Sequence, residues 1–473
     1  MNTGAFIALL VAHMDKLVST LKSPLLLNTP DPKKLRERLQ RWSELDNAPM
    51  SPVTGKPYSK DCYLKMMIIG IGYLFPMCAL FAAFDYWKEL FAERAASIEF
   101  EIMVVYQTAS VGTVFALSLV ESMDMHLRIV GGFIGQFISL LFIATFPLLS
   151  EFVPSAILYY VLMVFTLSMA VSTGFLDSAL LCFNSQYSPR MQEALQIGIG
   201  CSIFASVLYR DVTKMIGSNI EESSIIYFVC SLLTVIACLW NYISLLRHPV
   251  SWPVRASPVF RGEAAGRGDD TPITLSLVSD AEDNSLSTSL LVHPSEITTS
   301  SVLRKCWKNQ LVVFMHFIFC SLGYPAMITA IPLYSESLRS SFLGRENWYQ
   351  AMLLTVFTVT DTVSRFAVRE RFSFKSTNFW KSVVMRFALI PLLWVAAAGW
   401  VRSDLFSIVA VVLFGLTNGY CISLSLILMN EIPGMNIQEL AVAGRFSAFS
   451  VNSGLCVGGI LAALFSSVFI TSS

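Results

Sequence analysis

Residues 64–87 read LKMMIIGIGYLFPMCALFAAFDYW, with charged side chains only at Lys65 and Asp85, close to the two ends. A helix needs about 20 mostly apolar residues to cross the hydrocarbon core of a bilayer, and this stretch has that length. An open strand cannot satisfy its backbone hydrogen bonds in lipid, so the stretch must be helical. It therefore predicts a membrane-spanning helix, which Pro76 can kink.

Segments of the same kind recur along the chain, and together they predict about eleven spans. The fold class that we expect is an all-α polytopic membrane protein, since every span must be a helix. The further segments are residues 101–121, 128–149, 154–177, 191–210, 223–246, 309–333, 348–368, 381–400, 404–429 and 442–470.

The composition agrees with a lipid environment. Hydrophobic residues make up 54% of the 473 residues and charged residues 14%, whereas soluble domains contain about 25% charged residues. The mean hydropathy is +0.61. Lys and Arg number 33, as do Asp and Glu, so no excess of positive charge indicates nucleic acid as a partner.

The sequence lacks the motifs of catalytic and metal-binding chemistry. Its ten cysteines are scattered and form no CxxC pair, so we expect reduced packing residues and no metal site. No HExxH, GxSxG, Walker or GxGxxG motif occurs. We therefore expect neither an enzyme nor a cofactor.

A polar stretch of different composition separates the sixth predicted span from the seventh. Residues 249–303 are rich in Ser, Thr, Pro, Gly and Asp and lack apolar periodicity, which is typical of disorder. The predicted division is a cytoplasmic N-terminal region at 1–62, helices 1–6 at 63–247, a disordered cytoplasmic linker at 248–306 and helices 7–11 at 307–473.

Basic residues gather before the first span, around the linker and after the eighth span, which lie on one side if every span crosses once. Examples are Lys33, Lys34, Arg36, Arg247, Arg304, Lys305, Arg369, Arg371 and Lys375. The positive-inside rule makes this side, and with it the N-terminus, cytoplasmic. We expect a multi-pass protein of the plasma membrane, with an intracellular membrane as the alternative.

Charged residues inside spans mark candidate sites, because each costs about 2.5 kcal/mol or more to insert. In the eighth span Asp361 and Arg365 lie four residues apart on one helix face, with Thr358 a turn before Asp361. The carboxylate can accept hydrogen bonds from sugar hydroxyls, and the arginine can hold an oxygen- or nitrogen-rich ring. An internal ion pair that only fixes helix packing is equally open.

Three other charged residues have simpler interpretations. Arg386, near the start of the ninth span, either lies deep in the bundle or reaches back to the cytoplasmic face. We slightly favour the second alternative. Asp177 ends the fourth predicted span, and the polar stretch 184–196 after it is expected to be a loop and helix start. Glu193 is then a first-turn acid.

Five stretches, taken in chain order, match the motifs of one family. Residues 70–87 resemble a glycine-rich run followed by Leu-Leu-Pro-Trp-Asn, and 323–326 are similar to Phe-Pro-Ala. Residues 357–365 resemble Phe-Asn-x-x-Asp-x-x-Gly-Arg, 386–393 resemble Arg-x-x-x-x-Pro-Leu-Leu, and 417–424 resemble Ser-Asn-Gly-Tyr-x-x-Ser-Leu. On these motifs the chain resembles the equilibrative nucleoside transporters over most of its length.

The resemblance implies a major-facilitator-like fold and alternating-access transport of nucleosides or nucleobases, either facilitative or coupled to protons. In helix 4 it leaves Thr173, Leu176 and Asp177 open as the match to a base-contacting glutamine. Asp361 could itself carry a proton if it lost Arg365 in one state. The implied substrate-binding positions are Asp361, Arg365, Thr358, Leu74, Met77, Cys78, Phe81, Tyr324 and Leu455.

The chain departs from the family pattern on the side where ligand would bind. Met77 and Cys78 replace the family's Trp-Asn, Thr358 replaces its Asn and Ser364 replaces its Gly. Nucleoside versus nucleobase preference therefore stays open. The alternatives are a transporter of another small polar solute on the same fold, or a non-transporting receptor or scaffold.

Overall fold

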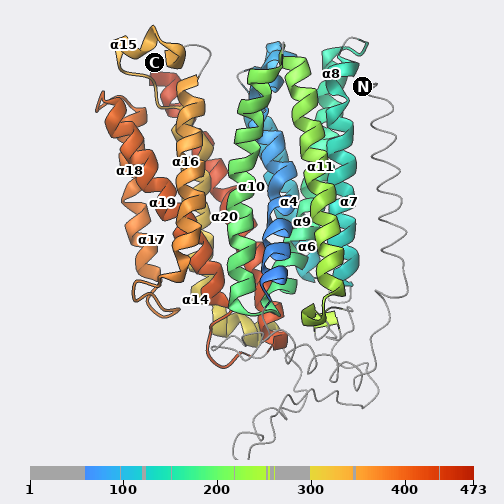
Figure 1. Cartoon of the computed structure of the whole chain (residues 1–473). Coiled ribbons are helices and arrows are strands. Elements are labelled where there is room, and N and C mark those ends of the chain that lie inside the picture. The colour runs from blue at the N-terminus through green and yellow to red at the C-terminus, as the bar shows by residue number, and fades with distance from the viewer. Residues whose placement is uncertain are drawn as a thin grey trace, which may run out of the picture.

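The computed structural model describes residues 59–95, 97–119, 124–150, 152–217, 219–251, 254–255, 260, 299–344, 348–435 and 437–472. In these residues all regular secondary structure is helical (Figure 1). The expectations for residues 1–58 and for most of the linker, 261–298, lie outside the described part of the chain.

Eleven of the described helical segments are long and apolar enough to cross a membrane, which confirms the predicted number of spans. The first six correspond to α4 (Lys60–Ala82), α6 (Ile98–Leu119), α7 (Met125–Ala144), α9 (Ser155–Ser185), α10 (Pro189–Ile216) and α11 (Ile220–Arg247). The last five correspond to α14 (Thr299–Leu322), α16 (Trp348–Phe366), α17 (Trp380–Phe387) with α18 (Leu389–Ala397), α19 (Asp404–Met429) and α20 (Ile437–Ser472).

Short helices connect or extend these spans. They are α5 (Phe84–Leu90), η1 (Ala92–Arg94), α8 (Phe146–Leu149), η2 (Pro249–Ser251), η4 (Gly323–Met327), α15 (Glu336–Arg339), η5 (Phe342–Gly344) and η6 (Ala367–Arg369). The chain therefore breaks at Ala83, inside the stretch 64–87 that we expected to be one helix.

Two other predicted boundaries are wrong. The fourth span continues past Asp177 to Ser185, and only residues 186–188 separate it from α10. The polar side chains there bond one another, Asn184 donating to Gln192, so the helix continues although its sequence becomes polar. Helix α14 begins at Thr299, inside the stretch expected to be linker.

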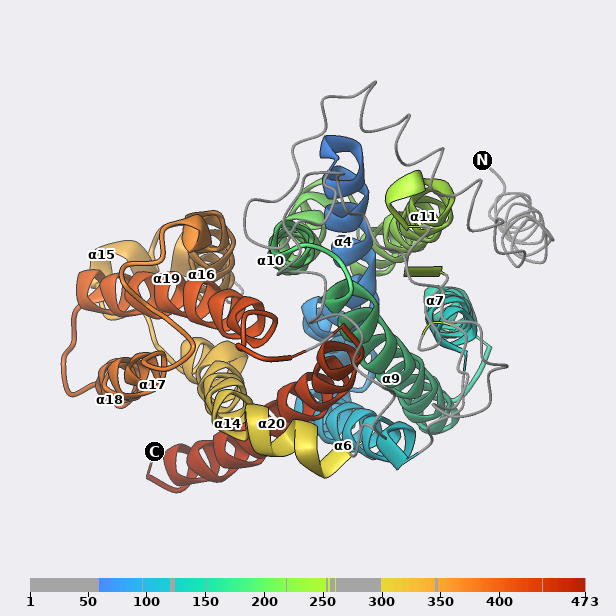
Figure 2. The ribbon, with the colours of Figure 1, turned by 90° about the horizontal axis from the view of Figure 1, so that it is seen from below.

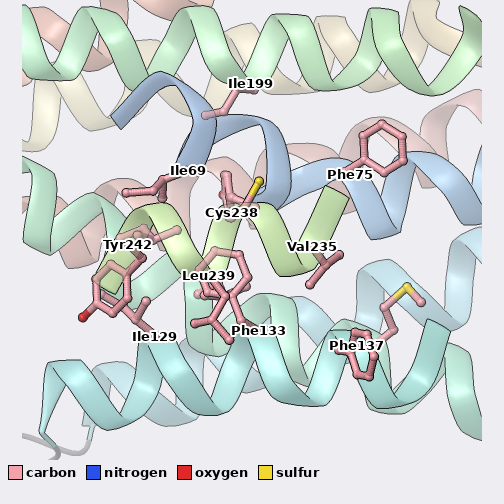
Figure 3. Close-up of a cluster of buried hydrophobic side chains, with 14 of the residues drawn as sticks. Ile69, Phe75, Ile129, Phe133, Phe137, Ile199, Val235, Cys238, Leu239 and Tyr242 are labelled. Carbon is pink, nitrogen blue, oxygen red and sulfur yellow. The ribbon is translucent and has the colours of Figure 1, made fainter. Parts of the chain in front are cut away.

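The helices form two groups, and we call α4–α11 bundle one and α14–α20 bundle two. Bundle one is built around α4, where glycines permit close backbone approach. A Cβ atom on Gly198 of α10 would collide with the carbonyl of Met67 of α4, and one on Gly72 would collide with Cys238 of α11. Figure 3 shows the apolar cluster where α4, α7, α10 and α11 meet, including Phe75 and Phe133.

In bundle two α14 packs along α20 and α16 packs along α19, with α17 and α18 at the outside (Figure 2). The two bundles touch along two seams. Helix α20 lies against α6 and α9 of bundle one, and α16 lies against α10. We call the ends of the bundles where α11 stops and α14 starts the linker side, and the opposite ends the far side.

Candidate functional site

Bundle two holds the predicted ion pair between Asp361 and Arg365 in its interior. Arg365 Nε donates to Asp361 Oδ2 at 2.9 Å. The side chain of Asp361 is 0% exposed and that of Arg365 is 2% exposed. The backbone of α19 comes this close because Gly419 has no side chain, since a Cβ there would collide with the carbonyl of Asp361. The sequence thus predicted both the pair and its burial.

Hydrogen bonds extend from this pair to a second buried guanidinium. Asn418 Nδ2 donates to Asp361 Oδ1 at 2.6 Å, and Arg386 Nη2 donates to Asn418 Oδ1 at 2.6 Å. Arg386 Nη1 donates to the carbonyl of His316 at 3.0 Å, and the guanidinium lies 5.5 Å from the ring centre of Phe414. We call these residues the central polar cluster.

The expectation that Arg386 reaches the cytoplasmic face is therefore wrong. Its side chain is fully buried, because the two oxygens and the aromatic ring compensate its charge inside the bundle. Among its described members, the central polar cluster has one carboxylate, Asp361, and two guanidinium groups, Arg365 and Arg386. It therefore carries an excess of positive charge.

Arg365 also joins bundle two to bundle one. Its Nη1 donates to the backbone carbonyl of Gln196 on α10 at 3.0 Å, and Thr362 donates to the carbonyl of Gly200 at 2.9 Å. Gly200 leaves the space that the Arg365 side chain fills. The central polar cluster therefore lies directly on a seam between the bundles.

The same seam carries a second ion pair nearer the linker side. Arg369 Nε donates to Glu193 Oε1 at 2.6 Å, and the hydroxyl of Tyr63 donates to the same oxygen at 3.2 Å. Glu193 lies beyond the first turn of α10 and is buried. The interpretation of Glu193 as a first-turn acid is therefore wrong, and this carboxylate links the two bundles.

On the far side the seam is closed more weakly. Thr355 donates to Asp211 Oδ2 at 3.4 Å, and Lys214 Nζ lies 5.4 Å from the ring centre of Trp348. Lys214 also pairs with Asp85 of α5 at 3.1 Å, as Arg210 does at 2.9 Å.

Asp85 shows how these far-side charges are balanced. Burial disfavours its charged form, but the charges and hydrogen bonds of Arg210 and Lys214 outweigh this and hold the pKa of Asp85 below its ordinary value. Asp85 is thus an anion that holds α5 against α10.

The predicted apolar positions lie in both bundles. Leu74, Met77 and Phe81 are half-buried along α4, and Cys78 is buried beside them. Leu455 of α20 packs against the apolar cluster that α14, α19 and α20 form.

Tyr324 lies at the break in α14, and its ring stacks on Phe357 with ring centres 4.6 Å apart. Thr358 is buried next to Phe357, but its hydroxyl donates to the carbonyl of Thr355 in its own helix. The structure therefore brings Tyr324 to the helix that carries Asp361, while the hydroxyl of Thr358 is already bonded.

The three alternatives in the fourth span, α9, have different surroundings. Leu176 is buried against Gly132 of α7. Thr173 accepts hydrogen bonds from Tyr106 at 2.7 Å and from Gln136 at 2.9 Å.

Asp177 accepts hydrogen bonds from the hydroxyl of Tyr73 and, at 2.6 Å, from Asn452 Nδ2 of α20. Asp177 is therefore inside a helix and at the second seam between the bundles, and not at the end of a span as expected.

Sequence reasoning missed the partners of these acids. Asn418, Tyr73 and Asn452 are polar residues within apolar spans, which is a usable signal, but their pairing depends on which helices touch. Among the described residues, no group of three or more His, Cys, Asp or Glu side chains could hold a metal ion.

Comparison with known proteins gives a family and a fold. A family model described as "Nucleoside transporter" matches residues 167–467, more than half of the chain. The chain is 20% identical to "Equilibrative nucleoside transporter 4" of Danio rerio over an alignment of 439 residues that covers 85% of this chain and 82% of that protein.

Other similarities cover less of the relative or show the fold alone. The chain is 28% identical to "Nucleoside transporter 2" of Leishmania donovani over 163 residues, 33% of this chain and 30% of that protein. Among solved structures, it resembles the major facilitator superfamily proton:xylose symporter XylE of E. coli with a TM-score of 0.54 at 11% identity, over 87% of this chain and 95% of that chain. This likeness confirms the major-facilitator-like fold.

Proposed function

Since the chain belongs to the nucleoside transporter family, we propose that this multi-pass integral membrane protein carries nucleosides or nucleobases by alternating access, with Asp361 and Arg365 at the centre of the substrate site. The observation that carries this proposal is the buried pair itself, which lies on the seam between two helix bundles.

The central polar cluster keeps free hydrogen-bonding capacity for a substrate. An ionised carboxylate has about four acceptor positions, and the described contacts of Asp361 use two, for Arg365 and Asn418. Asp361 can therefore accept from vicinal ribose hydroxyls or from ring N–H groups. Arg365 offers about five N–H donors, some of which can reach ring nitrogens or carbonyl oxygens.

Apolar and aromatic side chains would hold the base. Tyr324, already stacked on Phe357, presents an aromatic face in bundle two. The remaining proposed contacts are Leu74, Met77, Cys78 and Phe81 of α4, Leu455 of α20, Thr358 of α16 and Thr173 of α9, the fourth span.

Alternating access follows from the contacts along α10 and α16. They touch through Glu193–Arg369 near the linker side, Gln196–Arg365 about one helical turn further in and Asp211–Thr355 near the far side. Breaking the contacts of one end while keeping those of the other opens the centre to one side at a time, as two bundles rock about a fixed site. We propose 63–247 and 307–473 as the moving units, the second extended to the start of α14 at Thr299. Residues 1–62 and the rest of the linker would lie outside them.

Basic residues favour a cytoplasmic linker side. Arg369, Arg371 and Lys375 follow the end of α16 there, and Arg304 and Lys305 lie in the first two turns of α14. We propose that the N-terminus is cytoplasmic and that the protein works in the plasma membrane. Transport is either facilitative or driven by protons, with Asp361 as one acid that could carry them.

The test is uptake of radiolabelled adenosine, inosine, uridine and hypoxanthine by proteoliposomes that contain the full chain, with and without a pH gradient. We expect saturable uptake of at least one compound, and competition by the unlabelled compound. Saturable uptake of none of the four would refute the proposed function.

A further inference from the structure

Asp177 differs from the other buried acids of the described residues. The buried carboxylates there are Asp177, Glu193, Asp361 and Glu439. The last three each have a cationic partner within 4 Å, namely Arg369, Arg365 and Lys305. Asp177 has no ion pair among the described contacts, although it lies within a membrane-spanning helix.

The contacts of Asp177 are neutral donors from two other helices. The hydroxyl of Tyr73 on α4 bonds Oδ1, and Asn452 Nδ2 on α20 bonds Oδ2 at 2.6 Å. Asn452 is itself fixed by Ser110 of α6, whose hydroxyl donates to Asn452 Oδ1 at 2.7 Å. Asn452 therefore has a defined orientation, with its N–H directed at the carboxyl group.

The helices that pack against α9 place no cation beside this carboxyl in the described structure. The titratable groups that face Asp177 are Tyr73 of α4 and Tyr106 of α6, and α7 presents the neutral amide of Gln136. The guanidinium groups of Arg128 on α7 and Arg445 on α20 face Cys182, more than one helical turn nearer the linker side.

Glu193, on the remaining neighbour α10, is already paired with Arg369 of α16. No described neighbour of α9 therefore offers Asp177 a counter-charge.

This arrangement suits a group that is alternately neutral and charged. Burial without a cation favours the protonated form, whereas two donors favour the carboxylate, so the balance depends on each donor. One of the two donors, Asn452, belongs to the other bundle. Separation of α9 from α20 removes it and admits water, so the protonation state of Asp177 is tied to the movement of the bundles.

We infer that Asp177 binds the proton that this transporter moves together with its substrate. The inference rests on the proposed transport function and assigns the proton to Asp177, whereas Asp361 stays paired with Arg365. On the side where the centre is open, a proton from water forms an O–H bond with the Asp177 carboxylate. The neutral acid is enclosed with the substrate, and on the other side the O–H bond breaks and the proton returns to water.

The experiment compares substrate accumulation with substrate exchange in proteoliposomes of the full chain, using radiolabelled adenosine or another of the four test compounds that wild type exchanges. If one proton accompanies each substrate, a gradient of one pH unit with the acidic solution outside should raise substrate accumulation in the wild type about tenfold. Asp177→Asn cannot bind the transported proton, so accumulation should fall to the level without a gradient, and substrate-induced changes in internal pH should vanish. Exchange of internal for external substrate, which needs no net proton movement, should continue.

Two controls separate this inference from the proposed function. Ser139→Ala removes a hydrogen bond to α9, from Ser139 to Ser168 at 3.0 Å, without touching the acid, and should keep both activities. Asp361→Asn should lose exchange as well as accumulation. Wild type that exchanges substrate but moves no protons would overturn the inference and leave a facilitative transporter, and proton-driven accumulation by Asp177→Asn would overturn it too.

Asn452→Ala keeps the inference testable if Asp177→Asn does not fold. Loss of a donor to the carboxylate favours the proton, so the pH midpoint of uptake should move upward by about half a unit or more. An unchanged midpoint in this variant would show that Asp177 is not the titrating group.

Discussion

Replacing Asp361 by Asn tests whether the central pair is held by charge. The change keeps the size of the side chain but leaves the buried guanidinium groups of Arg365 and Arg386 without a carboxylate among their described neighbours. Removing one partner of a buried ion pair costs about 3–5 kcal/mol. We expect the apparent Tm of the purified protein in detergent to fall by about 5 °C, and uptake to fall by about 100-fold or more.

The double variant Asp361→Asn/Arg365→Gln separates charge balance from substrate binding. It removes both charges at once, so it should recover most of the lost stability, with a coupling of about 2 kcal/mol or more between the two sites. Uptake should stay lost, because the substrate then meets neither the carboxylate nor the guanidinium. Thermal unfolding followed by size-exclusion chromatography gives the first quantity, and uptake per inserted protein gives the second.

A stable single variant would refute the reasoning about charge. If Asp361→Asn melted and transported like wild type, the pair would neither compensate charge nor bind substrate. If the double variant were as unstable as the single variant, the loss would come from packing and not from the uncompensated Arg365.

Three further changes probe the surroundings of the site. Arg386→Lys keeps the charge but loses the planar fork that serves two acceptors, so initial uptake rates should fall about tenfold. Glu193→Gln removes the ion pair with the exposed Arg369, worth up to about 1 kcal/mol. Cys201 is a half-buried cysteine of α10, next to Gly200 on this seam, so a thiol reagent should label it up to about fivefold faster, as measured by mass spectrometry. An unchanged rate would show that the pair does not hold the seam. Gly198→Val places atoms where α4 has backbone, so the chain should lose its single size-exclusion peak, and a variant as stable as wild type would contradict the close contact.

The spans could be predicted from sequence because lipid imposes one rule on each of them. Length and apolar content decide whether a segment can cross, and no information on its neighbours is required. The pair of Asp361 and Arg365 could be predicted for a similar reason, since four residues on one helix fix their distance. Local periodicity was sufficient for both.

The sequence could not predict which side chains meet across helices. Arg386 was expected at the surface because its compensation by Asn418 and His316 comes from α19 and α14, far away in the chain. The predicted fourth span ends at Asp177 because the residues after it are polar. In the structure these residues are buried together with their hydrogen-bond partners, so the helix continues. Pairing between distant parts of the chain therefore explains both wrong predictions, and it also provides the hydrogen bonds of Asp177.

Asp361 and Asp177, two of the buried acids at the seams, differ in the charge around them. This difference determines how a proton-coupled cycle would respond to voltage. Asp361 keeps its cation in the described state, so its cluster has the same charge with and without a neutral nucleoside. The proton on Asp177 is then the one charge that distinguishes the loaded carrier from the empty one. A potential of 100 mV changes the free energy of moving that charge across the membrane by about 2.3 kcal/mol, whereas a pH difference of one unit contributes about 1.4 kcal/mol. It follows that, if Asp177 carries the proton, a membrane potential of about 100 mV contributes more than a pH difference of one unit to the direction of transport.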